Sequence, residues 1–248
     1  MIIEPSWPAG DRIIAFTTTR LGGVSKGNFA SLNLSFDVGD DPTDVEQNRK
    51  KILCNLPPST KIKWLHQEHG GKVIAADQEG SIRADASWTS SPGWACAIQT
   101  ADCLPVLFSD CNSSCVAAAH VGWRGLLCNI LENLTREMPI DNSQLMAWFG
   151  PRIGPKYFEI REGVVDEIRT WILSKGGAPE EFLKAHLRSP GCYLADLSGM
   201  AALALSSVGI SKIYRVDYCS YLKSNLFYSH RRDNGLTGRM ATVISLKY

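Results

Sequence analysis

Two short apolar runs near the middle of the chain predict a β-hairpin. Residues 105–110 (PVLFSD) and 115–119 (CVAAA) are mostly apolar, and residues 111–114 between them (CNSS) are typical of a turn. If the turn centres near Asn112 and Ser113, the numbers of paired residues sum to about 225, which puts Cys103 and His120 at the same open end. Neighbouring strands lie about 4.8 Å apart. The Cys103 thiolate and the His120 imidazole could therefore share one metal ion.

Other stretches of the chain predict further strands and helices. Apolar runs or alternation of apolar and polar residues indicate strands at residues 13–18, 29–38, 62–69, 94–99, 147–153, 212–218 and 241–247. Apolar residues at helical spacing indicate helices at residues 44–53, 125–138, 164–173, 180–187 and 196–207. Strands and helices interleave without a regular βαβ rhythm, and no Pro/Gly/Ser-rich linker separates two cores. We therefore expect an α+β fold in a single domain over residues 1–248.

Composition and charge are those of an ordinary globular protein. The 248 residues are 44% hydrophobic and 21% charged, with a formal net charge of +1. This balance gives no electrostatic footprint for nucleic acid or an anionic membrane, and no apolar run approaches the roughly 20 residues of a membrane span. The N-terminus has an acidic residue and two prolines where a signal peptide needs a basic start and an apolar centre. We expect a cytoplasmic protein with no nucleic-acid or membrane partner.

The five histidines and eight cysteines offer candidates for a metal site. No Cys-x-x-Cys occurs, which argues against a zinc ribbon, and most cysteines fit the pattern of small buried thiols. His66 and His69 are three residues apart, so on a strand they face opposite sides and at most one joins a given site. His69 is favoured by its position beside Gly70-Gly71. One such imidazole together with Cys103 and His120 is typical of a catalytic zinc site with an open fourth position.

Two aspartates near these candidates have more than one interpretation. Asp102, beside Cys103, could support the metal site or carry a proton, or it could simply bond a nearby backbone group. Asp85, in Ala84-Asp85-Ala86, is a candidate for a second polar pocket.

Arginines indicate where an anion could bind. Arg124 lies at a predicted helix start, where backbone N–H groups favour an anion. Arg20 and Ser25 belong to a glycine-rich loop at residues 20–27, which could approach an anion but on spacing alone is better explained as a tight turn. Three further arginines could form surface ion pairs or hold a phosphate, namely Arg231, Arg232 and Arg239. Spacing leaves both interpretations open.

Short motifs follow one another along the chain in the order of a known family. They are residues 18–25 (TTRLGGVS), 31–34 (SLNL), 67–70 (QEHG), 84–86 (ADA), 100–106 (TADCLPV), 120–125 (HVGWRG), 150–155 (GPRIGP), 231–233 (RRD) and 237–239 (TGR). In these motifs the chain resembles, almost end to end, the laccase-domain or YfiH-like family. That family is also described as multicopper polyphenol oxidase, as peptidoglycan editing factor and as purine nucleoside phosphorylase.

The resemblance implies a fold, a metal site and a set of activities. It implies that His69, Cys103 and His120 hold zinc, which selects His69 over His66, and that a β-sandwich-like core of mixed sheets is flanked by helices. The implied activities are phosphorolysis of adenosine, inosine, guanosine and methylthioadenosine, and deamination of adenosine to inosine. Some members are linked instead to correcting peptidoglycan precursors. Three residues depart from the family pattern, namely Glu68, Ser220 and His230; Glu68 would add a carboxylate near the metal.

A laccase function does not fit the number of histidines. Multicopper oxidases distribute many imidazoles over several coppers, whereas this chain has five histidines and no His-x-His pair. Copper could occupy a His/Cys site adventitiously, since divalent affinity peaks at copper. A centre with one metal ion fits better.

These observations together predict a cytosolic, zinc-dependent purine nucleoside phosphorylase with adenosine deaminase activity, acting on purine nucleosides and phosphate. We expect Cys103 and Asp102 to act in catalysis. The residues expected to bind substrate or phosphate are Arg20, Ser25, Arg124 and Arg231. One alternative is a hydrolase that edits a peptidoglycan precursor with the same metal site, and another is a non-catalytic metal-binding interaction protein. The sequence does not indicate an oligomeric state.

Overall fold

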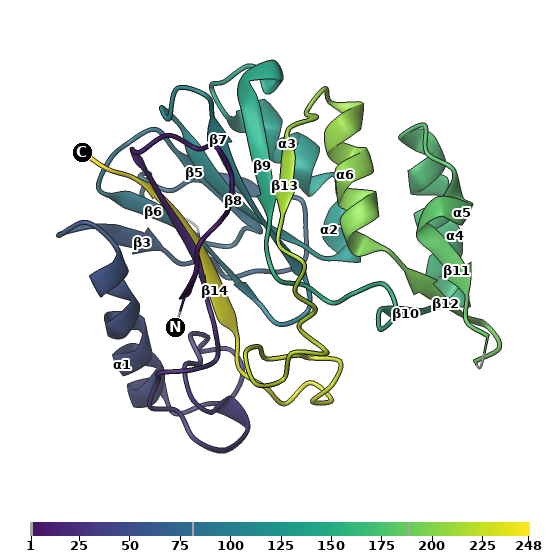
Figure 1. Ribbon diagram of the computed structural model, residues 1–248, viewed down its shortest axis with the longest axis horizontal. Coiled ribbons are helices and arrows are strands. Elements are labelled where there is room, and N and C mark those ends of the chain that lie inside the picture. Colours follow the sequence, from purple (N-terminus) through teal and green to yellow (C-terminus); the bar gives the residue numbers. More distant parts are fainter. Residues whose placement is uncertain (1, 81, 188) are drawn as a thin grey trace.

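Strands and helices alternate irregularly along residues 2–80, 82–187 and 189–248, which the computed structural model describes (Figure 1). The strands in these ranges are β1 (Ile2–Ile3), β2 (Ile13–Thr18), β3 (Lys61–Lys63), β4 (Val73–Ala75), β5 (Ala86–Thr89), β6 (Trp94–Thr100), β7 (Leu104–Asp110), β8 (Val116–Val121), β9 (Leu145–Phe149), β10 (Glu159–Arg161), β11 (Leu183–Ala185), β12 (Cys192–Ala195), β13 (Ile213–Arg215) and β14 (Met240–Leu246). The α-helices there are α1 (Pro42–Ile52), α2 (Trp123–Leu127), α3 (Ile130–Glu137), α4 (Glu162–Ser174), α5 (Pro179–Phe182) and α6 (Leu197–Ser207).

Two large mixed sheets pack face to face at the centre of the protein. One has the strand order β1-β2-β14-β6-β3 and the other β13-β9-β7-β8-β5-β4, while β10-β12-β11 forms a small separate sheet. Side chains alternate across each strand. Cys96 and Ile98 of β6 therefore pack against Leu107 and Trp148 of the facing sheet, whereas Ala95 and Ala97 face the other side. This arrangement confirms the predicted α+β fold with a sandwich core.

Helices cover the outer faces of both sheets (Figure 1). Helices α2, α3, α4 and α6 pack with the small sheet on the outer face of β7, β8 and β9. Helix α1 covers the five-stranded sheet on the other side, where Ile52 packs with Ala97 and Val243. None of the helices in the described ranges is long and apolar enough to cross a membrane.

The central hairpin has the predicted register. Strands β7 and β8 are antiparallel, with Leu104 opposite Val121 and Pro105 opposite His120, so paired numbers sum to 225. The carboxylate of Asp110, at the end of β7, closes the turn. It accepts hydrogen bonds from the backbone N–H groups of Asn112 (3.1 Å), Ser114 (2.7 Å) and Cys115 (2.8 Å). Residues 103 and 120 are thereby held at the open end of the hairpin.

Several predicted elements are wrong in extent or type. The strands predicted at 147–153 and 212–218 end early, at Phe149 and Arg215. The strand predicted at residues 29–38 does not form, because the Asn33 side chain bonds the backbone of Ser35 and curls the chain locally. The strand predicted at 62–69 ends at Lys63, and beyond it the chain turns towards Asp85. The helix predicted at 125–138 is divided into α2 and α3 at Asn129, whose φ is +55°. In the helix predicted at 180–187, α5 ends at Phe182 and β11 follows, because Leu183–Ala185 pairs with β12.

We expect Asp110→Ala to lower the free energy of unfolding by about 2 kcal/mol, because it leaves the buried N–H of Cys115 and two partly buried N–H groups of the turn without an acceptor. Asp110→Asn keeps one acceptor oxygen and should lose less. Burial by itself raises the pKa of Asp110, but the N–H groups of Cys115 and Ser114 bring it below its usual 3.8. A carboxyl group of this kind stabilises the fold above its unfolded pKa, and the stabilisation is lost as pH falls through the folded pKa.

Urea unfolding would therefore show the full difference between wild type and Asp110→Asn near neutral pH and a smaller one below about pH 4. A difference that stayed constant over that range would contradict this role for the ionised carboxylate.

Candidate functional site

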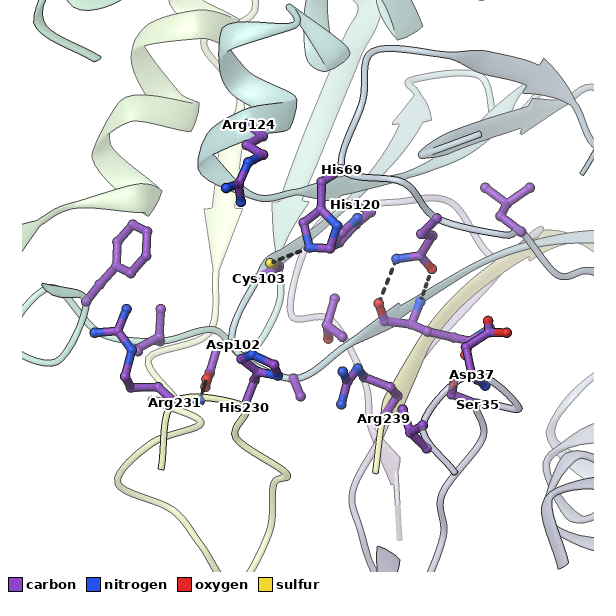
Figure 2. Close-up of a pocket in the computed structure, with 18 residues that line it drawn as sticks. Ser35, Asp37, His69, Asp102, Cys103, His120, Arg124, His230, Arg231 and Arg239 are labelled. Carbon is purple, nitrogen blue, oxygen red and sulfur yellow. Dashed lines mark hydrogen bonds between the residues drawn. The ribbon is translucent and has the colours of Figure 1, made fainter. Parts of the chain in front are cut away.

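A cavity of about 410 Å³ lies where β6 and β8 end and β7 begins (Figure 2). Its wall includes Thr100 at the end of β6, Cys103 just before β7 and His120 near the end of β8. His69, from the loop after β3, completes one side. The sheet sandwich thus brings residues from four separate segments to one place.

The hairpin puts Cys103 and His120 on the same side of their sheet. Leu104 and Val121 both point into the helix-side core, so their neighbours Cys103 and His120 point the other way. The ligand atoms of His69, Cys103 and His120 all lie within 4.8 Å of one another. The Cys103 Sγ is 3.9 Å from the Nε2 of His69. These three residues, called the His-Cys-His cluster below, could bind a metal ion together.

Asp85 determines the shape of the loop that carries His69. Its carboxylate accepts hydrogen bonds from the backbone N–H groups of Glu68 (3.1 Å), His69 (2.9 Å) and Gly70 (2.8 Å). Three successive N–H groups can converge on one carboxylate only if the chain turns sharply, and His69 has a φ of +58°. His66 lies outside the cluster, with its Nδ1 3.8 Å from Asp37. The structure therefore brings His69, and not His66, to Cys103 and His120.

The same carboxylate orients His120. The Asp85 Oδ1 lies 2.8 Å from the His120 Nδ1, and both residues are buried. Because an ionised carboxylate only accepts hydrogen bonds, the Nδ1 carries the proton and the Nε2 is left free to bind a metal. Burial raises the pKa of Asp85, but His120 and the loop N–H groups lower it overall, so the carboxylate stays ionised. Asp85 therefore belongs to this site, and its interpretation as part of a second polar pocket was wrong.

Electrostatics favour a thiolate at Cys103. Burial by itself raises the pKa of Cys103, but the imidazoles of His120 and His69 lower it to about 6. Burial lowers the pKa of His120, but Cys103 and Asp85 raise it to about 9. The pair is therefore poised as thiolate and imidazolium, and a bound cation would replace the imidazolium proton.

Gly122 lies beside the cluster, and its lack of a side chain leaves space there. A Cβ atom at this position would lie 3.2 Å from the Cys103 Sγ and 3.2 Å from the His69 Cδ2. Any larger residue would press against two cluster side chains. Two imidazoles and one thiolate also form the donor set that soft or borderline metal ions prefer. The residues present thus fit a metal in both chemistry and space.

Arginine side chains line part of the rest of the cavity. The Arg124 guanidinium stacks on Trp123 at 4.2 Å, and no acceptor for it is found among the described residues. Arg231 donates to the backbone oxygens of Tyr157 (3.4 Å) and Glu159 (2.8 Å). His230 and Arg239 also line the wall. The cavity is therefore suited to an anionic group.

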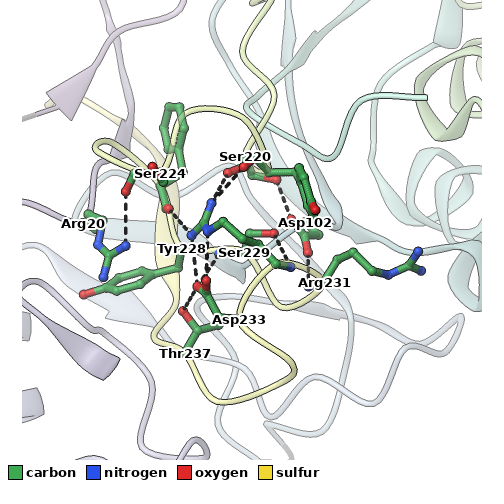
Figure 3. Close-up of polar contacts among 12 residues, drawn as sticks. Arg20, Asp102, Ser220, Ser224, Tyr228, Ser229, Arg231, Asp233 and Thr237 are labelled. Atoms are coloured by element: carbon green, nitrogen blue, oxygen red, sulfur yellow. Dashed lines mark hydrogen bonds and ion pairs between the residues drawn. The ribbon is translucent and has the colours of Figure 1, made fainter. Parts of the chain in front are cut away.

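Asp102 ties together the loops below the cluster (Figure 3). Its Oδ1 accepts a hydrogen bond from the Ser220 hydroxyl (2.6 Å), and its Oδ2 accepts one from the backbone N–H of Arg231 (2.7 Å). Ser220, one of the departures from the family pattern, thus supplies the hydroxyl. Asp102 has a φ of +93°, a strained value that these contacts maintain. The structure supports the interpretation in which Asp102 bonds the nearby backbone.

Arg20 and Ser25 do not line this cavity. The Arg20 side chain donates to the backbone oxygens of Ala30 (2.9 Å) and Ser224 (3.1 Å) (Figure 3), and Ser25 donates to Asp40 (2.6 Å). Their polar groups thus hold the loop together, in agreement with the tight-turn interpretation. Glu68 also points elsewhere, since its carboxylate pairs with Arg83.

Several residues of the site were missed or undervalued from the sequence, namely Asp37, Asp85, Gly122, His230 and Arg239. Asp85 had a usable signal, because a charged residue between alanines at the start of a buried strand needs a partner. Arg239 had been named only as a possible phosphate ligand, and Asp37 had no comparable signal, since both come from irregular segments whose mutual position is set by tertiary packing.

Comparison with known proteins finds relatives that belong to the family indicated by the sequence motifs. A family model described as multi-copper polyphenol oxidoreductase laccase matches residues 14–247. A purine nucleoside phosphorylase of Pseudomonas aeruginosa is 40% identical over 99% of this chain and 98% of its own length. The purine nucleoside phosphorylase YfiH of Escherichia coli is 42% identical with the same coverage.

Solved structures with the same fold cover nearly the whole chain. A crystal structure of a Neisseria meningitidis protein superposes with a TM-score of 0.92 at 37% identity, covering 100% of this chain and 99% of that one. The crystal structure of YlmD from Geobacillus stearothermophilus gives a TM-score of 0.86 at 33% identity, with coverage of 97% and 94%. These matches confirm the resemblance in the sequence motifs, and the chain belongs to the family described as multi-copper polyphenol oxidoreductase laccase.

Proposed function

We propose that the protein is a zinc-dependent purine nucleoside phosphorylase, which transfers the ribosyl group of a purine nucleoside to phosphate. The observation that carries this proposal is that one cavity joins a His-Cys-His cluster to a guanidinium, Arg124, without an acceptor among the described residues. The names of the relatives from P. aeruginosa and E. coli support the same reaction. The cavity volume, about 410 Å³, is within the range of small-molecule sites.

Zinc is the ion we propose for the cluster. Three protein ligands of nitrogen and sulfur with one side open to the cavity are typical of catalytic zinc sites. When bound by His69, Cys103 and His120, zinc would supply a Lewis acid beside the substrate. Asp85 fixes the His120 ring, and Gly122 leaves the room that the cluster needs.

Phosphate is proposed to bind at the end of the cavity lined by Arg124 and Arg231. Arg124 can offer a planar fork of donors to phosphate oxygens, because its guanidinium has no acceptor in the described part of the chain. Arg231 adds positive charge from the opposite loop, and Asp102 holds that loop through the Arg231 N–H. Asp102 is thus a positioning residue in this proposal.

The reaction requires one bond to form and one to break at the ribose C1′. A phosphate oxygen bonds to C1′ while the bond from C1′ to N9 of the purine breaks, and the purine leaves with that electron pair and takes up a proton. The products are the free base and ribose 1-phosphate. The arginines hold the phosphate charge in place, so that little reorganisation is needed when the bond forms.

The same cluster supports a second proposal, adenosine deamination. Its exposed side, at His69, faces the cavity, so a nucleoside turned with C6 of adenine towards the cluster could react there with water. Water would add its oxygen at C6 and ammonia would leave, which converts adenosine to inosine. Adenosine, inosine, guanosine and methylthioadenosine are the proposed substrates, and the cytosol is the proposed location.

The metal site can be tested with matched histidine variants. We expect His69→Ala, Cys103→Ala and His120→Ala each to lower zinc affinity by more than about 100-fold, because loss of an outer partner alone costs about 10- to 100-fold. His66→Ala, three residues from His69 but outside the cluster, should bind zinc as wild type does. Competition with a chelator, followed by elemental analysis, measures this. Full zinc binding in Cys103→Ala would contradict the proposed ligand set.

The activity can be tested by chromatography of the products formed from adenosine and from inosine, with and without phosphate. We expect wild type with measured zinc content to release adenine or hypoxanthine only when phosphate is present. Phosphate-independent conversion of adenosine to inosine would report deamination separately. Cys103→Ala should lose both reactions, while Cys54→Ala, with an exposed thiol remote from the cavity, should keep them.

If zinc-loaded wild type converted neither adenosine nor inosine, the phosphorylase proposal would be wrong. Peptidoglycan precursors would then be the substrates to test, and a protein inactive on those as well would fit a non-catalytic metal-binding role.

Arg124 can be tested by the dependence of rate on phosphate concentration. We expect Arg124→Ala to raise the KM for phosphate by about 10- to 100-fold, because charge-assisted hydrogen bonds to the anion are lost. Arg124→Lys should be intermediate, since lysine keeps the charge but not the planar fork. Arg136→Ala, an exposed arginine of α3 outside the cavity, is the control. An unchanged KM for phosphate in Arg124→Ala would exclude this position for the phosphate.

A further inference from the structure

One end of the cavity carries a carboxylate without a hydrogen-bond donor. In Figure 2, Asp37 and Ser35 lie on one side of the His-Cys-His cluster and Arg231 lies on the other. The Asp37 side chain is 64% exposed, and its oxygens accept no hydrogen bond from the described residues. The His66 Nδ1 lies 3.8 Å from Asp37, which is beyond hydrogen-bonding distance.

Asp37 differs in this respect from Asp102, the other carboxylate of the cavity wall. Both oxygens of Asp102 already accept hydrogen bonds, from Ser220 and from Arg231. Asp37 is therefore the wall carboxylate with both oxygens fully available to a bound ligand.

A donor with free N–H groups lies on the same side of the cavity. Both hydrogen bonds of the Arg239 side chain, to the backbone oxygens of Thr237 (2.9 Å) and Gly238 (3.1 Å), come from its Nη1. The Nε and Nη2 groups have no acceptor among the described residues. Asp37 and Arg239 influence each other through space but form no ion pair within those residues. An acceptor and a donor thus face the cavity without satisfying one another.

The position of the phosphate limits where the purine can lie. Phosphate attacks C1′ from the side opposite to the departing base, so phosphate, ribose and purine lie roughly in a line. If phosphate binds at Arg124 and Arg231, the ribose lies beside the cluster and the purine extends to the end with Asp37 and Arg239. This step rests on the proposed phosphorylase function.

We propose that Asp37 and Arg239 select 6-oxopurine nucleosides for phosphorolysis. Hypoxanthine and guanine present an N1–H donor beside the O6 acceptor, so Asp37 accepts from N1–H and Arg239 donates to O6. Adenine presents the opposite pattern, with an N1 acceptor beside the 6-amino donor. An adenine bound in the same orientation would place its N1 lone pair against the carboxylate of Asp37, which is repulsive. Inosine and guanosine are thus the preferred substrates for phosphorolysis.

The decisive measurement is the ratio of kcat/KM for inosine to that for adenosine, both with saturating phosphate. Asp37→Asn should lower the inosine value by about 10- to 100-fold, because the charged acceptor for N1–H is lost. The adenosine value should fall by less than about 3-fold or rise, since an amide can donate to the adenine N1. Asp11→Asn, an exposed aspartate outside the cavity, should keep the wild-type ratio.

Two further readouts separate a selective contact from general damage. Calorimetric titration with free hypoxanthine and free adenine should show the same inversion of preference in Asp37→Asn without any turnover. Zinc content and the KM for phosphate should stay at their wild-type values, since Asp37 touches neither proposed site.

The outcomes distinguish this inference from the function on which it rests. Wild type that phosphorolyses no purine nucleoside overturns the proposed function, and the selection by Asp37 with it. Active wild type with an unchanged ratio in Asp37→Asn overturns the selection alone. An inverted ratio with unchanged zinc content and phosphate KM supports it.

Discussion

The buried carboxylate of Asp85 is the group on which the geometry of the site depends. Asp85 is 1% exposed. An ionised carboxylate buried in this way destabilises the fold by several kcal/mol unless its oxygens accept hydrogen bonds. The backbone N–H groups of residues 68–70 and the ring N–H of His120 donate these hydrogen bonds. The hydrogen bonds that the Asp85 carboxylate needs therefore determine both the conformation of the loop that carries His69 and the orientation of the His120 ring. The two imidazoles converge because they are held by the same carboxylate.

The charge of the cavity cannot be inferred from the charge of the chain. The formal net charge is only +1, yet the cavity wall includes Arg124, Arg231 and Arg239. Of its two carboxylates, Asp102 is bound on both oxygens by its own protein, while Asp37 lies beyond the cluster at the other end. This separation divides the cavity into an end for an anion and an end for a group with hydrogen-bond donors. The two substrates of the proposed reaction, phosphate and a purine nucleoside, fit that division.

Local signals predicted the parts of the fold that local interactions determine. The β7–β8 hairpin was predicted to the correct register because its two apolar runs and the turn residues between them lie within 20 residues, and the positions of Cys103 and His120 followed from it. Helices α4 and α6 were also recognised from their spacing. The family was identified from the order of the short motifs along the chain. Tertiary interactions overrode the prediction elsewhere: pairing with β12 turned Leu183–Ala185 into a strand, and no periodicity reports that contact.

The long-range contacts of the site explain what the sequence could not supply. Asp85 is 35 residues from His120, and Asp102 is 118 residues from Ser220 and 129 from Arg231. Arg20 was expected to bind phosphate because its loop is rich in glycine, but its guanidinium is taken by backbone oxygens of the loop itself and of residue 224. Whether an arginine serves a ligand or the fold depends on which acceptors surround it, and those acceptors come from distant segments. The same test distinguishes Arg124 from Arg20.

The family description names copper chemistry, but the ligand inventory of this chain points to a single metal centre. A multicopper oxidase needs many imidazoles close together, and the histidines outside the cluster lie apart from it: His66 is beside Asp37, His186 is near Glu159, and His230 lines the cavity without joining the ligand group. A cluster of two imidazoles and one thiolate can hold one ion. Its neighbours are arginines and a carboxylate that suit an anion and a hydrogen-bonding base, whereas electron transfer between metals would require further ligands. The surroundings of the cluster therefore suit the proposed group transfer on a polar substrate better than electron transfer.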